Sequence, residues 1–208
     1  MNNYNKDLAD LVIKNSLTIE NAQKVLSDIS TEFLNSLSEY VKGFFKSKQW
    51  ICDYTNNEDD LYFRKETWTK NGSVIASFYL WYEEESKYFE YLTIAVGNTP
   101  KFLAFGFTCE YTQAAMNRPR FRAFLRQEYA NQNFEGPFSL TDDGLGIKIP
   151  FTLSAESLAE FYPDFTRSFD NIDIVLENIE NNIDKFNKIV EDFCAANGSH
   201  AKKRKRAL

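Results

Sequence analysis

The chain has 208 residues, 43% of them hydrophobic, and a formal net charge of −6. A chain of this length buries roughly 70% of the surface that its unfolded form exposes, so we expect a folded protein that needs neither disulfides nor metals for stability. We find no apolar run near the ~18 residues that span a bilayer and no secretory signal at residues 1–6, which favours a cytoplasmic protein, or a nuclear one in a nucleated cell.

Several residue types that catalysis often uses are scarce or badly placed. His200 is the single histidine and lies eight residues from the C-terminus, where a chain end seldom holds an imidazole rigidly beside a nucleophile. Cys52, Cys109 and Cys194 lack the close pairing of zinc ligands. We also find no glycine-rich phosphate-binding motif. The sequence therefore argues against histidine-based catalysis, and we predict no cofactor and no bound metal.

The first strong pattern predicts a long helix over residues 18–45, capped by Thr18. Its apolar residues recur every three or four positions, as in a helix with one buried stripe. They are Ile19, Ala22, Leu26, Ile29, Phe33, Leu37, Tyr40 and Phe44.

Residues 49–110 predict an antiparallel meander. Asn71-Gly72 between two alternating runs is a strong signal for a two-residue hairpin turn. The predicted hairpin places Phe63 opposite Leu80, and residues 88–96 and 102–110 supply the next strands. One sheet face then carries a set of polar and aromatic residues that suits protein binding or base stacking, unless a helix covers it. This aromatic set is Tyr62, Arg64, Trp68, Tyr79 and Trp81.

A helix is predicted over residues 117–129. Arg118, Arg122 and Arg126 fall four residues apart, so they share one face. That face would bind phosphates or an acidic protein, or it is simply a solvated surface. A strand over 147–153 and a short helix over 154–161 follow.

The last helix, from residue 170, carries an apolar heptad seam to residue 193. We weigh two interpretations: a helix packed on the 18–45 helix within one chain, and a homodimer through residues 170–193. Beyond it stand Lys202, Lys203, Arg204, Lys205 and Arg206, and because these five carry +5, the rest of the chain carries −11. Such a run is typical of a flexible arm that binds nucleic acid, of a nuclear import signal, or of residues left by cloning.

Carboxylates gather near two predicted turns of the meander. Together with one lysine they would suit a Mg²⁺-dependent nuclease, although charged hairpin tips also keep sheet ends soluble. The residues of this alternative site are Asp53, Asp60, Glu83, Glu85 and Lys87.

The sequence thus predicts one α+β domain over residues 1–197, with an antiparallel sheet of five or six strands, long terminal helices packed on it, and a flexible basic tail over 198–208. We expect a non-catalytic interaction protein whose acidic, aromatic-rich body binds a protein partner, for example as an inhibitor or regulator of a nucleic-acid enzyme. The alternatives are the nuclease and a non-specific nucleic-acid binder that uses the arginine face and the tail.

Overall fold

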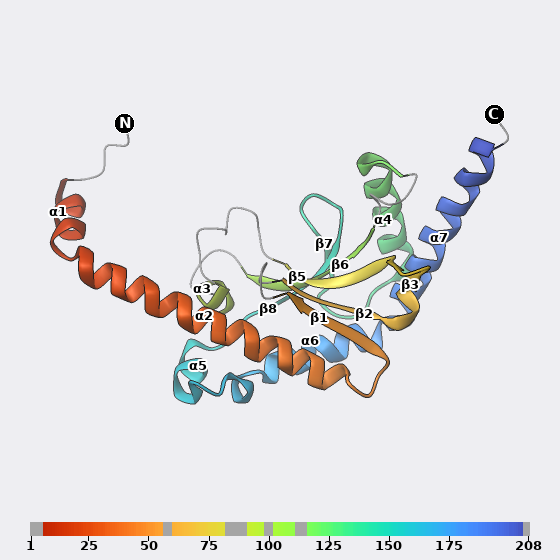
Figure 1. Ribbon diagram of the computed structural model, residues 1–208. Helices are drawn as coiled ribbons and strands as arrows, with labels where there is room; N and C mark the ends of the chain where they lie inside the picture. The colour runs from red at the N-terminus through yellow and green to blue at the C-terminus, as the bar shows by residue number, and fades with distance from the viewer. Residues whose placement is uncertain (1–5, 56–59, 82–90, 98–101, 111–115, 206–208) are drawn as a thin grey trace.

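The computed structural model describes residues 6–55, 60–81, 91–97, 102–110 and 116–205 (Figure 1). Its centre is a six-stranded antiparallel sheet in the order β1-β2-β5-β6-β8-β7, which confirms the predicted α+β class. The strands of this sheet are β1 (Trp50–Thr55), β2 (Asp60–Lys65), β5 (Ala76–Trp81), β6 (Leu103–Cys109), β7 (Ser139–Leu140) and β8 (Ile147–Phe151).

Seven helices accompany the sheet in the described part of the chain. They are α1 (Lys6–Lys14), α2 (Ser16–Phe45), α3 (Tyr91–Ala95), α4 (Arg118–Gln132), α5 (Ala155–Phe161), α6 (Asp170–Asn181) and α7 (Ile183–Lys205). The predicted helix over 18–45 is confirmed as α2, although Asn15 rather than Thr18 takes its N-cap position. Ser154 caps α5, because its hydroxyl accepts a hydrogen bond from the amide of Ser157 at 3.2 Å.

The two long terminal helical segments pack together, as expected. Phe33 of α2 makes edge-to-face contacts with Phe165 and Phe169, at ring centroid distances of 5.9 and 6.0 Å. The hydroxyl of Tyr40 donates a hydrogen bond to Asp173 of α6 at 2.8 Å. In Figure 1 both α2 and α6 lie on the same side of the sheet. The core therefore lies between these helices and one face of the sheet.

The hairpin at Asn71-Gly72 forms its predicted turn in a short ribbon, β3 (Thr69–Lys70) and β4 (Ser73–Val74). Further from the turn, the predicted pairing is wrong, because Phe63 lies opposite Phe78 rather than Leu80. Residues 66–68 form a 3₁₀ turn, η1 (Glu66–Trp68). This turn adds two residues to one side of the hairpin and so shifts the register between β2 and β5 by two.

Two other elements differ from the sequence prediction. The expected strand over residues 88–96 is wrong, since the described residues 91–95 form helix α3, whose end is marked by Gly97 at φ +66°. The C-terminal helix is broken at Asn182, which is 1% exposed. Its side-chain amide donates to the carbonyl of Glu135 at 2.9 Å and accepts from the Glu135 amide at 3.0 Å. A buried side chain that pairs with a neighbouring loop thus competes with helix continuation.

No helix in the described segments is long and apolar enough to cross a membrane.

Candidate functional site

Trp68 does not belong to an exposed aromatic face, so this part of the prediction is wrong. Its side chain is 2% exposed and its ring centroid lies 5.4 Å from that of Phe107. The indole nitrogen donates a hydrogen bond to Asn187 of α7 at 2.8 Å. The 3₁₀ turn is the physical reason, because it ends the strand alternation that would have placed Trp68 beside Tyr62 and Arg64.

The other four members of the aromatic set lie on the opposite sheet face and are half-buried. Burial raises the pKa of Tyr79 strongly, and the carboxylate of Asp143 adds to this rise. The ammonium of Lys148 lies 4.2 Å from the ring centroid of Trp81. Arg64 forms an ion pair with Asp53. These side chains therefore interact with neighbouring charged residues and offer less open surface than the alternating pattern predicts.

The predicted arginine face divides into a structural part and an open part. The guanidinium of Arg118 forms an ion pair with Asp143 at 3.3 Å, and Nε of Arg122 donates to the carbonyl of Asp143 at 2.6 Å. Arg126 is exposed on α4. Two of the three arginines thus attach α4 to the loop before β8.

The structure brings together few of the predicted nuclease residues. Asp53 lies on β1 and is committed to its ion pair with Arg64, and Asp60 begins β2 opposite Thr55. Glu83, Glu85 and Lys87 lie outside the described residues. Within the described ranges, no group of three or more histidine, cysteine or acidic side chains could hold a metal ion.

The C-terminal seam is buried inside one chain. Ile172, Leu176, Ile179 and Phe186 are each 0% exposed, which favours the intramolecular interpretation over a homodimer through residues 170–193. Further on, the backbone of α7 continues to Lys205 and so includes Lys202, Lys203 and Arg204, with Arg206 outside the described residues. The flexibility of this tail and its binding of nucleic acid stay predictions.

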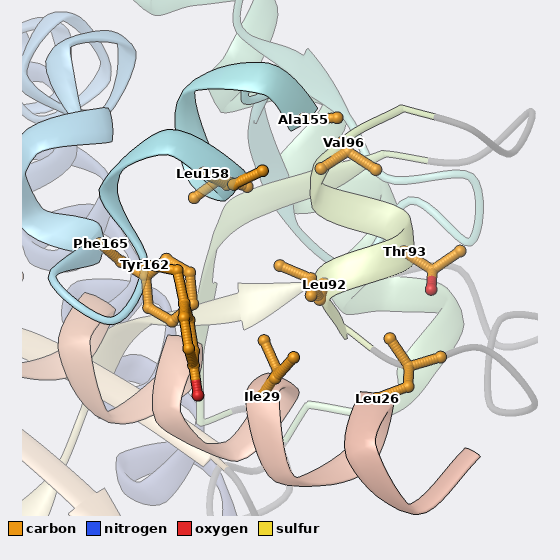
Figure 2. Close-up of a pocket in the computed structure, with 10 residues that line it drawn as sticks. Leu26, Ile29, Leu92, Thr93, Val96, Ala155, Leu158, Tyr162 and Phe165 are labelled. Carbon is orange, nitrogen blue, oxygen red and sulfur yellow. The ribbon is translucent and has the colours of Figure 1, made fainter. Parts of the chain in front are cut away.

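Sequence reasoning does not predict one further feature, an apolar groove of about 470 Å³ between α2, α3, α5 and the turn after α5. Figure 2 shows its side chains converging from these elements. Its walls are Leu26, Ile29, Leu92, Thr93, Val96, Ala155, Leu158, Ala159, Tyr162 and Phe165. The sequence gives no signal for this groove, because the pattern over residues 88–96 predicts a strand, whereas helix α3 supplies one wall.

The groove has very few polar groups. Thr93 and Tyr162 supply the only side-chain oxygens among its lining residues. The pKa of Tyr162 is raised by the negative charge of Glu32 and by its hydrogen bond to that carboxylate. A surface with so little hydrogen-bonding capacity suits apolar side chains better than it suits a polar substrate.

A second exposed apolar surface adjoins the groove along α2. All side chains from residue 10 to residue 25, a segment that we name the arm, are exposed, and in Figure 1 this part of the chain extends away from the sheet. The expected burial of Ile19 and Ala22 is therefore wrong, because α2 is longer than the body it packs on. The exposed large hydrophobic residues of the arm are Leu11, Val12, Ile13, Leu17, Ile19 and Val25.

In comparisons with protein-family models, with curated proteins and with solved structures, no match to this chain was found.

Proposed function

We propose that this protein is a non-catalytic interaction protein that binds a polypeptide partner through the arm and the groove. One observation carries the proposal: the apolar arm leads directly into the apolar groove, because Leu26 and Ile29, which line the groove, follow Val25 on the same helix. A continuous exposed apolar surface is typical of a protein interaction site.

The distribution of exposed hydrophobic residues supports this location. Among the eight large hydrophobic residues that are well exposed in the described part of the chain, six lie in the arm and a seventh, Tyr162, lines the groove. Single apolar side chains scattered over a surface need no explanation, whereas such a concentration does. The aromatic sheet face, which the sequence suggested as the binding surface, is half-buried and supports partner binding less well.

The distribution of charge along the chain adds a secondary feature to the proposal. Outside its five C-terminal basic residues the chain carries −11, and an acidic surface steers basic partners toward a protein. A nucleic-acid enzyme, which presents basic surface to its substrate, is one concrete form of partner that this charge favours, and the chain would then act as its inhibitor or regulator.

A matched pair of variants tests the proposal. Ala159→Glu places a charge in the groove, and Ala123→Glu places the same charge on the exposed surface of α4. The tagged variants and the parent chain are used to capture proteins from a lysate of the source cell that also contains the untagged chain. We expect the parent chain and Ala123→Glu to capture the same partner, and Ala159→Glu to lose it. That partner is either another protein or the untagged copy of this chain. Equal retention by all three would contradict the proposal.

A further inference from the structure

We propose that the polypeptide bound by the arm is a second copy of this chain, with the two arms packed antiparallel and each reaching the groove of the other copy. This inference rests on the proposed function, since it identifies the occupant of the same surface. It differs from a dimer through residues 170–193, whose apolar seam is buried inside one chain.

The helix of the arm gains little stability from packing of its own side chains, which are all exposed. The side chains of residues 16–25 in α2 are all exposed, so about 15 Å of this helix lies beyond the core. Isolated helices shorter than roughly 12–15 residues are marginal in water, and most helices in proteins are stabilised by packing of an apolar face. A second helix on the arm would supply that packing.

The apolar seam of the protein core continues along the arm. Phe33 is 0% exposed in the core, and the same helix face carries apolar residues at alternating steps of three and four in the N-terminal direction. This is the spacing by which two helices pack against each other. The residues of this outer seam are Ile19, Ala22, Leu26 and Ile29.

The charged residues of the arm and its immediate surroundings are kept off this seam. None of them falls at a seam position. The positions directly beside the seam, which would face a packed helix, are held by uncharged residues such as Ser16, Thr18, Gln23 and Val25. A helix against this face would therefore bury no unpaired charge. The charged residues are Asp10, Lys14, Glu20, Lys24 and Asp28.

The seam is complementary to itself in one antiparallel register. With Ile19 facing Ala22 of the second copy, a large side chain meets a small one on both sides of the two-fold axis. In the same register Lys14, which ends α1 and pairs with Asp10 of its own helix, comes within one residue of the level of Asp28 of the second copy. These opposite charges are favourably arranged, and the symmetry repeats them.

The same register also brings the second copy to the groove. Asn15, where the chain leaves helical geometry between α1 and α2 at φ −113° and ψ 15°, comes level with Leu26, a lining residue of the groove. Helix α1 of the second copy, with Leu11 59% and Val12 45% exposed, therefore leaves the line of α2 at the edge of the groove. An amphipathic helix in an apolar groove is a common recognition mode.

The mass of the full chain in solution tests dimer formation. Light scattering during size-exclusion chromatography over a range of concentrations should give twice 24.2 kDa. Ile19→Glu should raise the dimer dissociation constant by at least about tenfold, because the charge is buried on both arms. Asn21→Glu is the matched control, since Asn21 is exposed, lies off the seam and is not one of the hydrophobic residues of the arm. Circular dichroism checks that both variants fold.

Disulfide cross-linking tests the register. A mixture of Ile19→Cys and Ala22→Cys chains should form mixed cross-linked dimers under mild oxidation in preference to dimers of either variant with itself. Preferential cross-linking of Ile19→Cys to itself would indicate parallel arms and overturn the proposal, as would a monomeric parent chain at every concentration. If the purified chain is monomeric while Ala159→Glu still loses a different captured protein, the dimer is wrong and the proposed function stands.

Discussion

Tyr79 lies across Gly106 of the neighbouring strand, so that its ring occupies the space above the glycine. The two residues are opposite each other in the β5–β6 pair. A Cβ atom on Gly106 would lie 3.0 Å from Cζ of Tyr79 and 3.2 Å from Cβ of Trp81. The glycine thus allows the tyrosine to lie flat on the sheet, which accounts for much of the burial of Tyr79.

We expect Gly106→Ala to lower the free energy of unfolding by about 1–3 kcal/mol, because the added methyl group must displace Tyr79 or Trp81. Denaturant titration followed by circular dichroism measures the change. Gly43→Ala is the control, since a Cβ atom there meets nothing within 4 Å in helix α2. That substitution should stabilise the protein by up to about 1 kcal/mol through helix propensity. Equal effects of both variants would contradict the packing argument.

Asn182 joins the break between α6 and α7 to the loop at Glu135. Asn182→Ala would leave the amide and carbonyl of Glu135 without their side-chain partners and should cost about 2–3 kcal/mol of unfolding free energy. The adjacent Asn181 is exposed, so Asn181→Ala should change stability by less than about 0.5 kcal/mol. Denaturant titration of both variants measures the difference. A loss for Asn182→Ala no larger than that for Asn181→Ala would show that the buried hydrogen bonds contribute little.

Local patterns predicted much of the fold. The three-and-four spacing of apolar residues from Ile19 to Phe44 predicted α2, and Asn71-Gly72 predicted its hairpin turn, because both signals depend on neighbours in the chain. Antiparallel strands in the meander could be predicted for the same reason. The burial of Ile19 could not, since a helix stripe indicates which residues share a face and not how far the body extends beneath it.

The candidate site depended on features that lack a local signal. Three residues of 3₁₀ turn decide whether Trp68 faces the core, and Tyr91–Ala95 has the β-branched and aromatic composition of a strand although it forms helix α3. Tertiary packing overrides propensity in such short segments. The groove needs α2, α3 and α5 together, so no single stretch of sequence could indicate it.

The hydrogen bond between Tyr40 and Asp173 predicts a loss of stability at alkaline pH. Burial and the hydrogen bond to Asp173 raise the pKa of Tyr40 from 10.0 to about 12, so the folded state retains the phenol proton longer than the unfolded state does. The resulting stabilisation is fully present below pH 10 and is lost as the pH rises from 10 to 12.

Removing the hydroxyl tests this dependence. Tyr40→Phe should flatten the decline of the unfolding free energy between pH 10 and 12 relative to the parent chain. Denaturant titrations at several pH values in that range measure both slopes, and a titration of tyrosinate absorbance provides an independent check. Identical slopes for the two proteins would mean that Tyr40 has the same pKa in the folded and unfolded states.

The different positions of Trp68 and Trp81 predict different costs of truncation. Trp68 is 2% exposed, packs on Phe78 and Phe107 and donates a hydrogen bond to Asn187. Trp68→Ala should therefore cost about 3–5 kcal/mol of unfolding free energy through the cavity it leaves.

Trp81 is half-buried on the other sheet face, where it contacts Phe102 and the ammonium of Lys148. Because water can reach this site, Trp81→Ala should cost clearly less than Trp68→Ala. Denaturant unfolding of both variants, followed by circular dichroism, gives the comparison. A smaller loss of unfolding free energy for Trp68→Ala than for Trp81→Ala would contradict the placement of Trp68 in the core by the 3₁₀ turn at Glu66–Trp68. It would favour the exposed aromatic face that strand alternation alone predicts.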